Sequence, residues 1–145
     1  MKIHELGHVV LYVTNLQKMA DFYRDTLGFR EVVREWPMAA FSSGRTHHEL
    51  LLIEVGGAAE RSPQPKPGLY HIGFKIADND AELKQALEEL RGKGVQIVGL
   101  SDHTVTHSLY ILDPDGNELE LYADVSDAWK SDPSLIAAPV RPLRL

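Results

Sequence analysis

The chain contains two copies of one short pattern, and each copy carries a histidine at the same place. The first copy reads L-G-H-V-V-L-Y-V-T-N-L and contains His8, whereas the second reads L-Y-H-I-G-F-K-I-A-D-N and contains His71. The two histidines are 63 residues apart (71 − 8), and this distance is the length of the repeat. Tandem units of this kind usually bury their apolar faces against each other. The repeat therefore predicts two similar modules whose curved sheets face each other across a pseudo-twofold axis.

The first copy predicts a strand, a helix and three further strands. Residues 6–13 alternate and are rich in Val and Leu, which is typical of a strand with His8 in its middle. Thr14 or Asn15 can cap the helix, and Gly28 closes it in the left-handed conformation. The apolar positions at helical spacing are Leu16, Met19, Ala20, Tyr23 and Leu27. The three strands are expected at residues 29–35, 38–43 and 48–55, the last two as a hairpin around Ser43-Gly44-Arg45.

The second copy predicts the same order of elements. Residues 69–77 form the first strand, and Asn79 or Asp80 caps a helix that Gly92 and Gly94 end. One face of this helix carries Leu83, Ala86, Leu87 and Leu90. Strands are then expected at residues 95–99, 107–112 and 118–122, the last two joined by Asp115-Gly116-Asn117, which is a strong turn signal.

The predicted fold is α+β, with two tandem βαβββ modules that form a metal-binding cavity. Module 1 covers residues 4–60 and module 2 covers residues 67–124, within one domain over residues 1–124. The stretch R-S-P-Q-P-K-P-G at residues 61–68 has three prolines and is interpreted as the linker. The C-terminal tail, residues 125–145, has no clear period. The sequence leaves open whether it covers the cavity, contacts a dimer partner or packs on the surface.

Composition excludes several classes of function. The 145 residues are 43% hydrophobic, so a packed core is expected, and the net charge of −6 with no basic block argues against nucleic acid and membrane partners. There is no cysteine, so a metal must be bound by nitrogen and oxygen. No apolar run approaches the roughly 20 residues of a membrane span, and the N-terminus does not resemble a signal peptide. We therefore expect a cytoplasmic protein.

The matched histidines point to one shared metal site. A buried imidazole needs partners for its ring nitrogens, and two of them at equivalent positions are most simply explained by convergence on a ligand. Glu120, in N-E-L-E-L-Y, lies on the strand face opposite Leu119 and Leu121. Two imidazoles and one carboxylate form a facial triad, which favours Fe(II) in an O2-using enzyme, with Mn(II) as a close relative. Ni(II) and Zn(II) accept the same ligands, and a purely structural pair of histidines is the alternative.

Two further residues of the first module are candidates for the site. His48 lies four residues after the hairpin glycine Gly44, as Glu120 lies four residues after Gly116, so it is interpreted as the counterpart of Glu120. An unperturbed pKa of about 6.5 would suit a histidine to accept and return a proton. Glu54 has the same parity as His48 and is the rival fourth ligand, although a solvated or edge carboxylate is the simpler interpretation.

The stretch S-D-H-T-V-T-H-S-L-Y adds candidates at the rim of the cavity. His103, His107 or both could line it, although a lone histidine is more often a loop residue. Tyr110 lies ten residues before Glu120 across the hairpin, so the two side chains are able to face the same space, with core packing as the alternative.

At these residues the chain resembles the vicinal oxygen chelate superfamily, which includes glyoxalase I, fosfomycin-resistance proteins, bleomycin-binding proteins and type I extradiol dioxygenases. The resemblance covers roughly residues 4–124. It rests on G-H-V-V-L-Y-V-T-N-L followed by D-F-Y-R-D-T-L-G-F, on Y-H-I-G-F, and on D-P-D-G-N-E-L-E-L-Y. Among these families the chain is most similar to the single-domain catechol 2,3-dioxygenase-like branch, through H-H-E-L-L-L-I and S-D-H-T-V-T-H-S-L-Y.

The resemblance implies roles for particular residues. His8, His71 and Glu120 match the three iron ligands, and His48 matches the acid-base histidine. His103 matches a histidine that lies next to the metal ligands without binding the metal itself, and Tyr110 matches a tyrosine near the substrate. The resemblance also implies a homodimer. The extra N-terminal domain of the two-domain dioxygenases is not expected in this protein, and W-P-M-A-A-F gives no recognisable substrate code.

The resulting hypothesis is an Fe(II)-dependent extradiol dioxygenase that cleaves a catechol-type aromatic diol with O2, as in aromatic hydrocarbon catabolism. A rival enzyme is a glyoxalase-like isomerase or lyase with Ni(II) or Zn(II), which would need Glu54 or His48 as a fourth ligand. A third possibility is a non-catalytic resistance protein that sequesters a small molecule.

Overall fold

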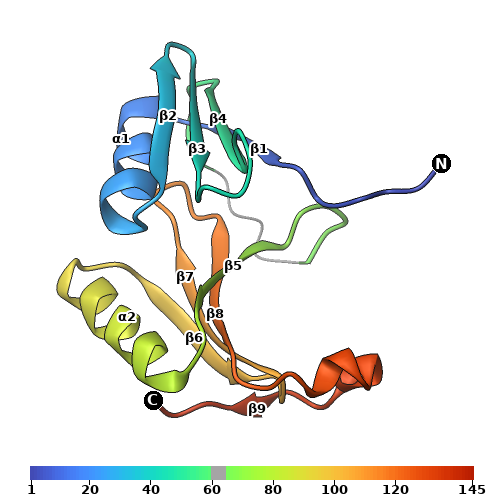
Figure 1. The fold of residues 1–145 in the computed structure, drawn as a ribbon. Helices are drawn as coiled ribbons and strands as arrows, with labels where there is room; N and C mark the ends of the chain where they lie inside the picture. Colours follow the sequence, from blue (N-terminus) through green and yellow to red (C-terminus); the bar gives the residue numbers. More distant parts are fainter. Residues whose placement is uncertain (60–64) are drawn as a thin grey trace. The chain divides into compact units, whose positions relative to one another are not determined.

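The computed structural model describes residues 1–59 and 65–145, and it separates into two compact units. The first unit comprises Met1–Arg61 with Pro114–Gly116, and the second comprises Ser62–Asp113 with Asn117–Leu145. Each unit has a mixed β-sheet with one principal helix against it (Figure 1). The predicted linker at 61–68 lies partly outside the described residues, and the predicted domain limits stay predictions.

The first unit has the predicted β-α-β-β-β order. Its elements are β1 (Val9–Val13), α1 (Leu16–Asp21) continued by the π-helical turn η1 (Phe22–Thr26), β2 (Arg30–Glu35), β3 (Met38–Ser42) and β4 (Leu50–Glu54). The strand order is β1-β4-β3-β2, with β1 parallel to β4 and the other pairs antiparallel. Alternation decides the two faces of β1, because Leu11 and Val13 are buried while Val10 and Tyr12 are exposed. Helix α1 packs on the sheet against β3 and β4, and Met19, Tyr23 and Phe41 are fully buried in this core.

Two boundaries in this unit differ from the expectation. His8 does not lie in the middle of a strand, because β1 begins only at Val9 and His8 is exposed. His48 does not lie on a strand either, because β4 begins at Leu50. The connection between β3 and β4 spans residues 43–49, and Ser42 Oγ holds it by donating to the carbonyl of Thr46 at 2.7 Å.

The second unit repeats the order and adds the C-terminal tail. Its elements are β5 (His71–Ala77), α2 (Asp80–Gly92), β6 (Ile97–Asp102), β7 (Thr106–Leu112), β8 (Glu118–Asp124), the 3-10 turns η2 (Ala128–Lys130) and η3 (Pro133–Ala137), and β9 (Arg141–Pro142). The strand order is β5-β8-β7-β6-β9. Strand β5 is parallel to β8, and the remaining pairs are antiparallel. The fully buried Leu83, Leu109, Ile111 and Leu119 form the centre of its core.

Both helices begin at the predicted asparagines. The Asn15 side chain accepts a hydrogen bond from Lys18 N at 2.8 Å, and the Asn79 side chain accepts one from Glu82 N at 3.0 Å. Such caps satisfy backbone N–H groups that the first turn of a helix leaves unpaired.

The order of elements in the two units confirms the expected α+β fold with tandem βαβββ modules. In the described residues, none of the helices combines the length and apolar character needed to cross a membrane.

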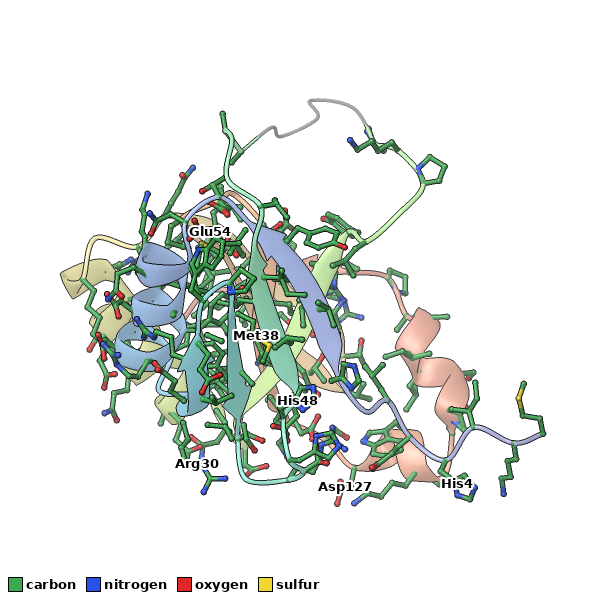
Figure 2. All side chains as sticks on the ribbon, turned by 90° about the horizontal axis from the view of Figure 1, so that it is seen from above. His4, Arg30, Met38, His48, Glu54 and Asp127 are labelled. Carbon is green, nitrogen blue, oxygen red and sulfur yellow. The ribbon has the colours of Figure 1, made fainter. Side chains whose placement is uncertain are left out.

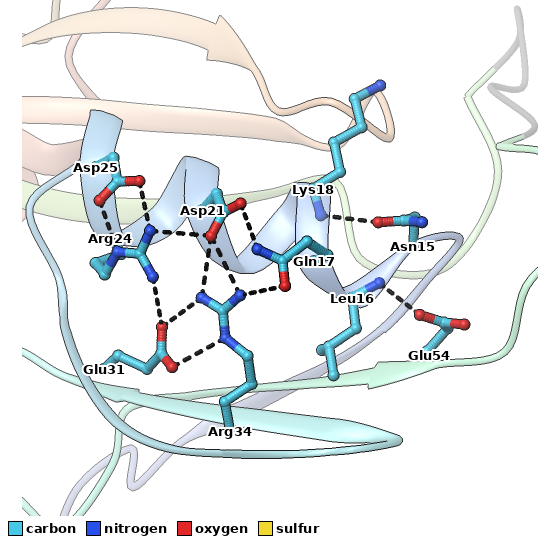
Figure 3. Close-up of polar contacts among 10 residues, drawn as sticks. All are labelled: Asn15, Leu16, Gln17, Lys18, Asp21, Arg24, Asp25, Glu31, Arg34 and Glu54. Atoms are coloured by element: carbon cyan, nitrogen blue, oxygen red, sulfur yellow. Dashed lines mark hydrogen bonds and ion pairs between the residues drawn. The ribbon is translucent and has the colours of Figure 1, made fainter.

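An ion-pair network ties α1 to β2 (Figure 3). Arg34 Nε donates to Glu31 Oε1 at 2.9 Å, and Arg34 Nη1 donates to Asp21 Oδ1 at 3.2 Å. The hydrogen bond from Arg34 lowers the pKa of Glu31 below its ordinary value. The amide of Gln17, and after it Arg34, lowers the pKa of Asp21. Carboxyl groups with lowered pKa values stabilise the fold above the unfolded-state pKa, and this contribution is lost as the pH falls through the folded-state value.

We predict that Arg34→Met lowers the free energy of unfolding by about 1 kcal/mol or less at pH 7. The deficit should begin to shrink when the pH falls below about 4, the range of the unfolded-state pKa values, and should disappear as the pH falls through the lowered folded-state values. Urea unfolding at several pH values measures it. Arg30→Met is the matched control, because Arg30 lies on the same strand and makes no ion pair with the described residues. An equal deficit for both variants, or one that does not change with pH, would contradict the prediction.

Candidate functional site

A cavity of about 460 Å³ lies in the second unit. This volume is within the usual range of small-molecule sites, roughly 300–1,000 Å³. One side is formed by polar groups of the sheet, among them His71, Tyr110 and Glu120. Another part of the lining is formed by apolar side chains of the C-terminal tail, among them Trp129 and Ile136. The cavity thus combines groups capable of chemistry with an apolar wall formed by the tail.

The centre of the polar side is a pair formed by His71 and Glu120. His71 is the first residue of β5, and Glu120 lies on β8, the parallel neighbour of β5. His71 Nε2 and Glu120 Oε2 are 3.1 Å apart. The alternation predicted for β8 is confirmed, since Leu119 and Leu121 are buried while Glu120 reaches the cavity. These two predicted site residues are therefore brought together.

A glycine leaves room for this pair. Glu120 is directly opposite Gly73 in the β5–β8 ladder, and Gly73 shares a strand face with His71 two residues earlier. A Cβ atom on Gly73 would lie 3.5 Å from Glu120 Oε2 and 3.6 Å from the Tyr122 ring. A side chain longer than that of alanine would therefore compete with the carboxylate for its place beside His71. Gly73 was not among the predicted site residues, although a glycine inside a strand often marks a place where another group approaches closely.

Hydrogen-bond donors hold the carboxylate from its other side. Glu120 Oε1 accepts from Ser108 Oγ at 2.6 Å and from the Tyr110 hydroxyl at 3.1 Å. His103 Nε2 is 2.9 Å from the same hydroxyl, so Tyr110 lies between His103 and Glu120. Burial, and after it the negative charge of Glu120, raises the pKa of Tyr110 well above its ordinary value. Tyr110 therefore remains a neutral hydrogen-bond donor. Ser108 was not predicted as a site residue, although it lies two residues before Tyr110 and therefore on the same face of the strand.

The two histidines of the S-D-H-T-V-T-H segment have different surroundings. His103 lines the cavity. His107 directly precedes Ser108 on β7, so its side chain is on the opposite face of the strand. Its Nδ1 is 2.6 Å from Asp80 Oδ1, at the start of α2. Its Nε2 is 3.5 Å from Asp102 Oδ1. Of the two rim candidates, the one that lines the cavity is therefore His103.

The pair His71 and Glu120 fits part of a divalent metal site. Donor atoms that bind one ion at about 2.1 Å and at right angles lie roughly 3 Å apart, close to the observed separation. His71 Nδ1 is buried without a hydrogen-bond partner in the described residues. If Nδ1 carries the proton, the Nε2 lone pair faces a carboxylate, and a cation between the two would remove this repulsion. Within the described chain, however, no three His, Asp or Glu side chains surround one point. His8 is in the first unit, so the three-ligand set stays a prediction.

A histidine cluster is present in the first unit. The rings of His8 and His48 have centroids 4.6 Å apart, and His47 Nδ1 is 2.6 Å from His48 Nδ1. Partial burial, and after it the charges of His47 and His8, lowers the pKa of His48. His48 is therefore mainly neutral at pH 7 and able to accept a proton. The structure thus brings two predicted site residues, His8 and His48, side by side.

The interpretation of His48 as the counterpart of Glu120 is wrong. In the β1–β4 ladder Val10 is opposite Leu51, whereas in the β5–β8 ladder Gly73 is opposite Glu120. Since Gly73 follows Val10 by one repeat, the counterpart of Glu120 is Leu51. The count from the hairpin glycines failed because the β3–β4 connection, residues 43–49, is longer than the β7–β8 connection, residues 113–117.

Glu54 has a structural partner. Its Oε2 accepts a hydrogen bond from Leu16 N at 2.7 Å, at the first turn of α1 (Figure 3). Glu54 and His48 lie at opposite ends of β4 (Figure 2). A strand of five residues separates its ends by roughly 13 Å, so the two side chains do not approach one ion together. This contact gives Glu54 a role in capping α1, in place of the solvated or edge carboxylate expected from the sequence.

The comparisons with known proteins agree with the fold. The model of the Glyoxalase/Bleomycin resistance protein/Dioxygenase superfamily matches residues 5–121. The chain belongs to this superfamily. A solved structure of an integron cassette protein from the Halifax Harbour sewage outfall matches with a TM-score of 0.64 and 26% identity, over 83% of this chain and 99% of that protein.

Several curated relatives are more than 30% identical. The catechol-2,3-dioxygenase of Bacillus subtilis (strain 168) is 34% identical over 90% of this chain, and biphenyl-2,3-diol 1,2-dioxygenase 3 of Rhodococcus globerulus is 36% identical over 82% of it. This chain spans only 46% and 63% of these two relatives. The glutathione transferase FosA of Serratia marcescens is 32% identical over 83% of this chain and 81% of that relative.

We predict that Glu54→Gln and Glu120→Gln separate a structural carboxylate from a metal-binding one. Glu54→Gln should lower the free energy of unfolding by about 1 kcal/mol and leave divalent-metal affinity unchanged, because it weakens a helix cap. Glu120→Gln should lower metal affinity by at least about tenfold. Chemical unfolding and calorimetric titration with Fe(II) or Zn(II) measure the two effects. Loss of metal affinity in Glu54→Gln would instead make Glu54 a ligand.

Proposed function

We propose that this chain is an Fe(II)-dependent extradiol dioxygenase that cleaves a catechol-type aromatic diol with O2. The observation that carries the proposal is the pair His71 and Glu120, backed by Ser108 and Tyr110 at the edge of a small-molecule cavity. Membership of the superfamily and the similarity to catechol and biphenyl-diol dioxygenases support it. A homodimer and a cytoplasmic location remain predictions from the sequence.

In this proposal His8, His71 and Glu120 hold the metal, with His8 supplied by the first module. Bound Fe(II) supplies the Lewis acidity and redox capacity that a reaction between a diol and O2 requires. Ser108 and Tyr110 keep the carboxylate in one orientation through their hydrogen bonds. Such supporting hydrogen bonds fix a ligand and tune its basicity.

The proton transfers are assigned to His48 and Tyr110. A catechol must lose a hydroxyl proton to react, and His48, whose lowered pKa keeps it mainly neutral at pH 7, accepts this proton. Tyr110 keeps its own proton, which it donates to Glu120 in the structure; in the reaction this donor turns to negative charge that develops on the substrate oxygens, while Ser108 continues to hold Glu120. His103 positions the Tyr110 hydroxyl through the 2.9 Å contact. The apolar side chains of the tail complete the lining of the cavity.

A second candidate is a metal-dependent transferase or isomerase. The similarity to the glutathione transferase FosA favours it, because this chain spans 81% of that relative. A glyoxalase-like site with a fourth protein ligand is less well supported, because the Glu54 carboxylate is engaged at the start of α1.

We predict that protein reconstituted anaerobically with Fe(II) consumes one O2 per catechol and forms a yellow ring-opened product. His48→Asn should keep its iron and lose activity on the order of a hundredfold or more, because only the base is removed. His4→Asn, at an exposed histidine, is the matched control and should retain activity. Iron analysis and an oxygen electrode measure both. Iron-loaded protein that turns over no catechol, but consumes glutathione with a second substrate, would favour the transferase.

We also predict that Tyr110→Phe lowers kcat on the order of a hundredfold, with a smaller change in KM, because the lost hydroxyl acts on developing charge. Iron content should fall little, since Ser108 still donates to Glu120. Steady-state kinetics with parallel iron analysis measure this. A change confined to KM would show that the hydroxyl contributes only to substrate binding.

A further inference from the structure

The C-terminal tail is fixed to the second unit at both ends. At its start, Val125 N donates to the carbonyl of Val105 at 3.0 Å. Near its end, β9 pairs with β6, with Arg141 opposite Asp102 and Pro142 opposite Ser101. The turns η2 and η3 lie between these two attachments. The segment that carries Trp129, Pro133 and Ile136 to the cavity is therefore part of the sheet's own edge structure rather than a loose extension.

The tail gives the cavity an apolar wall that remains partly exposed to solvent. Trp129 is 43% exposed and Ile136 is 70% exposed, although both line the cavity. Large apolar side chains gain roughly 25 cal/mol for each Å² removed from water, so a ligand that covers them is favoured. His71, Tyr110 and Glu120 supply a polar part of the same lining. A ligand that matches the cavity therefore has one polar end and one apolar end.

The charges around the cavity also indicate which ligand substituents are disfavoured. None of the described residues that line it is a lysine or an arginine, whereas Glu120 and Asp124 both line it. Lys75 Nζ lies 2.9 Å from Asp124 Oδ2, and it also contacts Asp78, so its charge is already paired. A carboxylate on the apolar end of a ligand would find no cation there and would lose its hydration.

We propose that the tail selects the substrate, and that the cavity takes a catechol with an uncharged apolar substituent of aryl size, with Trp129 and Ile136 as specificity-determining residues. The diol end of this assignment rests on the proposed dioxygenase function. The assignment of the apolar end depends only on the apolar wall, and not on the proposed function. The preferred substituent is one that covers the exposed faces of Trp129 and Ile136 while the diol lies beside His71 and Glu120.

Binding to the metal-free protein tests the wall without turnover. The other tryptophan, Trp36, is 78% exposed in the first unit, so Trp36→Phe leaves Trp129 as the fluorescent reporter. The probes are 3-phenylcatechol, catechol and 2,3-dihydroxybenzoate. We expect 3-phenylcatechol to bind at least about tenfold more tightly than catechol, and 2,3-dihydroxybenzoate to bind most weakly. Equal dissociation constants for the three probes would overturn the proposal.

Substitutions in the tail identify the residues. Ile136→Ala in the Trp36→Phe background should weaken 3-phenylcatechol binding by about tenfold and leave catechol binding unchanged. Ile136 is largely exposed, so its truncation does not threaten folding. Val140→Ala is the matched control, because Val140 is an exposed aliphatic residue of the same tail that does not line the cavity. Equal effects of the two substitutions on 3-phenylcatechol binding would overturn the assignment.

Turnover by the iron-loaded protein separates this inference from the proposed function. With both correct, kcat/KM should be highest for 3-phenylcatechol and lowest for 2,3-dihydroxybenzoate, and Ile136→Ala should reduce the preference through KM. Turnover of all three diols with no preference would overturn the assignment of the tail wall as the element that determines specificity. A preserved binding preference without turnover of any diol, with iron verified bound, would overturn the dioxygenase and support the wall.

Discussion

The parallel pairing of β5 with β8 is the constraint on which the candidate site depends. It sets Gly73 opposite Glu120, and the missing side chain of Gly73 leaves space in which the carboxylate meets His71. On the other side of β8, the antiparallel pairing with β7 sets Tyr110 opposite Glu120. A shift of either register by one residue would turn Glu120 into the core and bring Leu119 or Leu121 to the cavity. The central position of β8 therefore gathers polar groups from both neighbouring strands around one carboxylate.

The two modules share a scaffold but use it for different purposes. Asn15 and Asn79 cap the two helices at equivalent points, and each module has a parallel pair between its first and last strands. In the first module the strand position equivalent to Glu120 is occupied by Leu51, and the carboxylate at the end of β4, Glu54, supports α1. The longer β3–β4 connection instead carries His48 to the ring of His8. The repeat is thus symmetric in its backbone and asymmetric in its chemistry.

The tail completes the chemistry of the second unit. The sheet provides polar groups held by hydrogen bonds, whereas the tail provides Trp129, Pro133 and Ile136 through two short 3-10 turns. The attachments at Val125 and at β9 position these side chains. Because the tail is attached to the sheet at both ends, less of it has to be ordered when a ligand binds, which is why a short terminal segment is able to influence which substituent is accepted.

The sequence by itself determined the repeat, the order of elements, both helix caps and the strand face that carries Glu120. These features follow from local periodicity and from hydrogen bonds between residues three or four positions apart, so the chain records them directly. Only the tertiary structure decided that Leu51, rather than His48, is the counterpart of Glu120, that Glu54 caps α1, and that the tail lines the cavity. These outcomes depend on connection lengths and on pairings between distant strands, and loop closure leaves no periodic signal in the sequence. For the same reason Ser108 and Gly73, ordinary residues when considered alone, acquire their roles only where β5, β7 and β8 lie side by side.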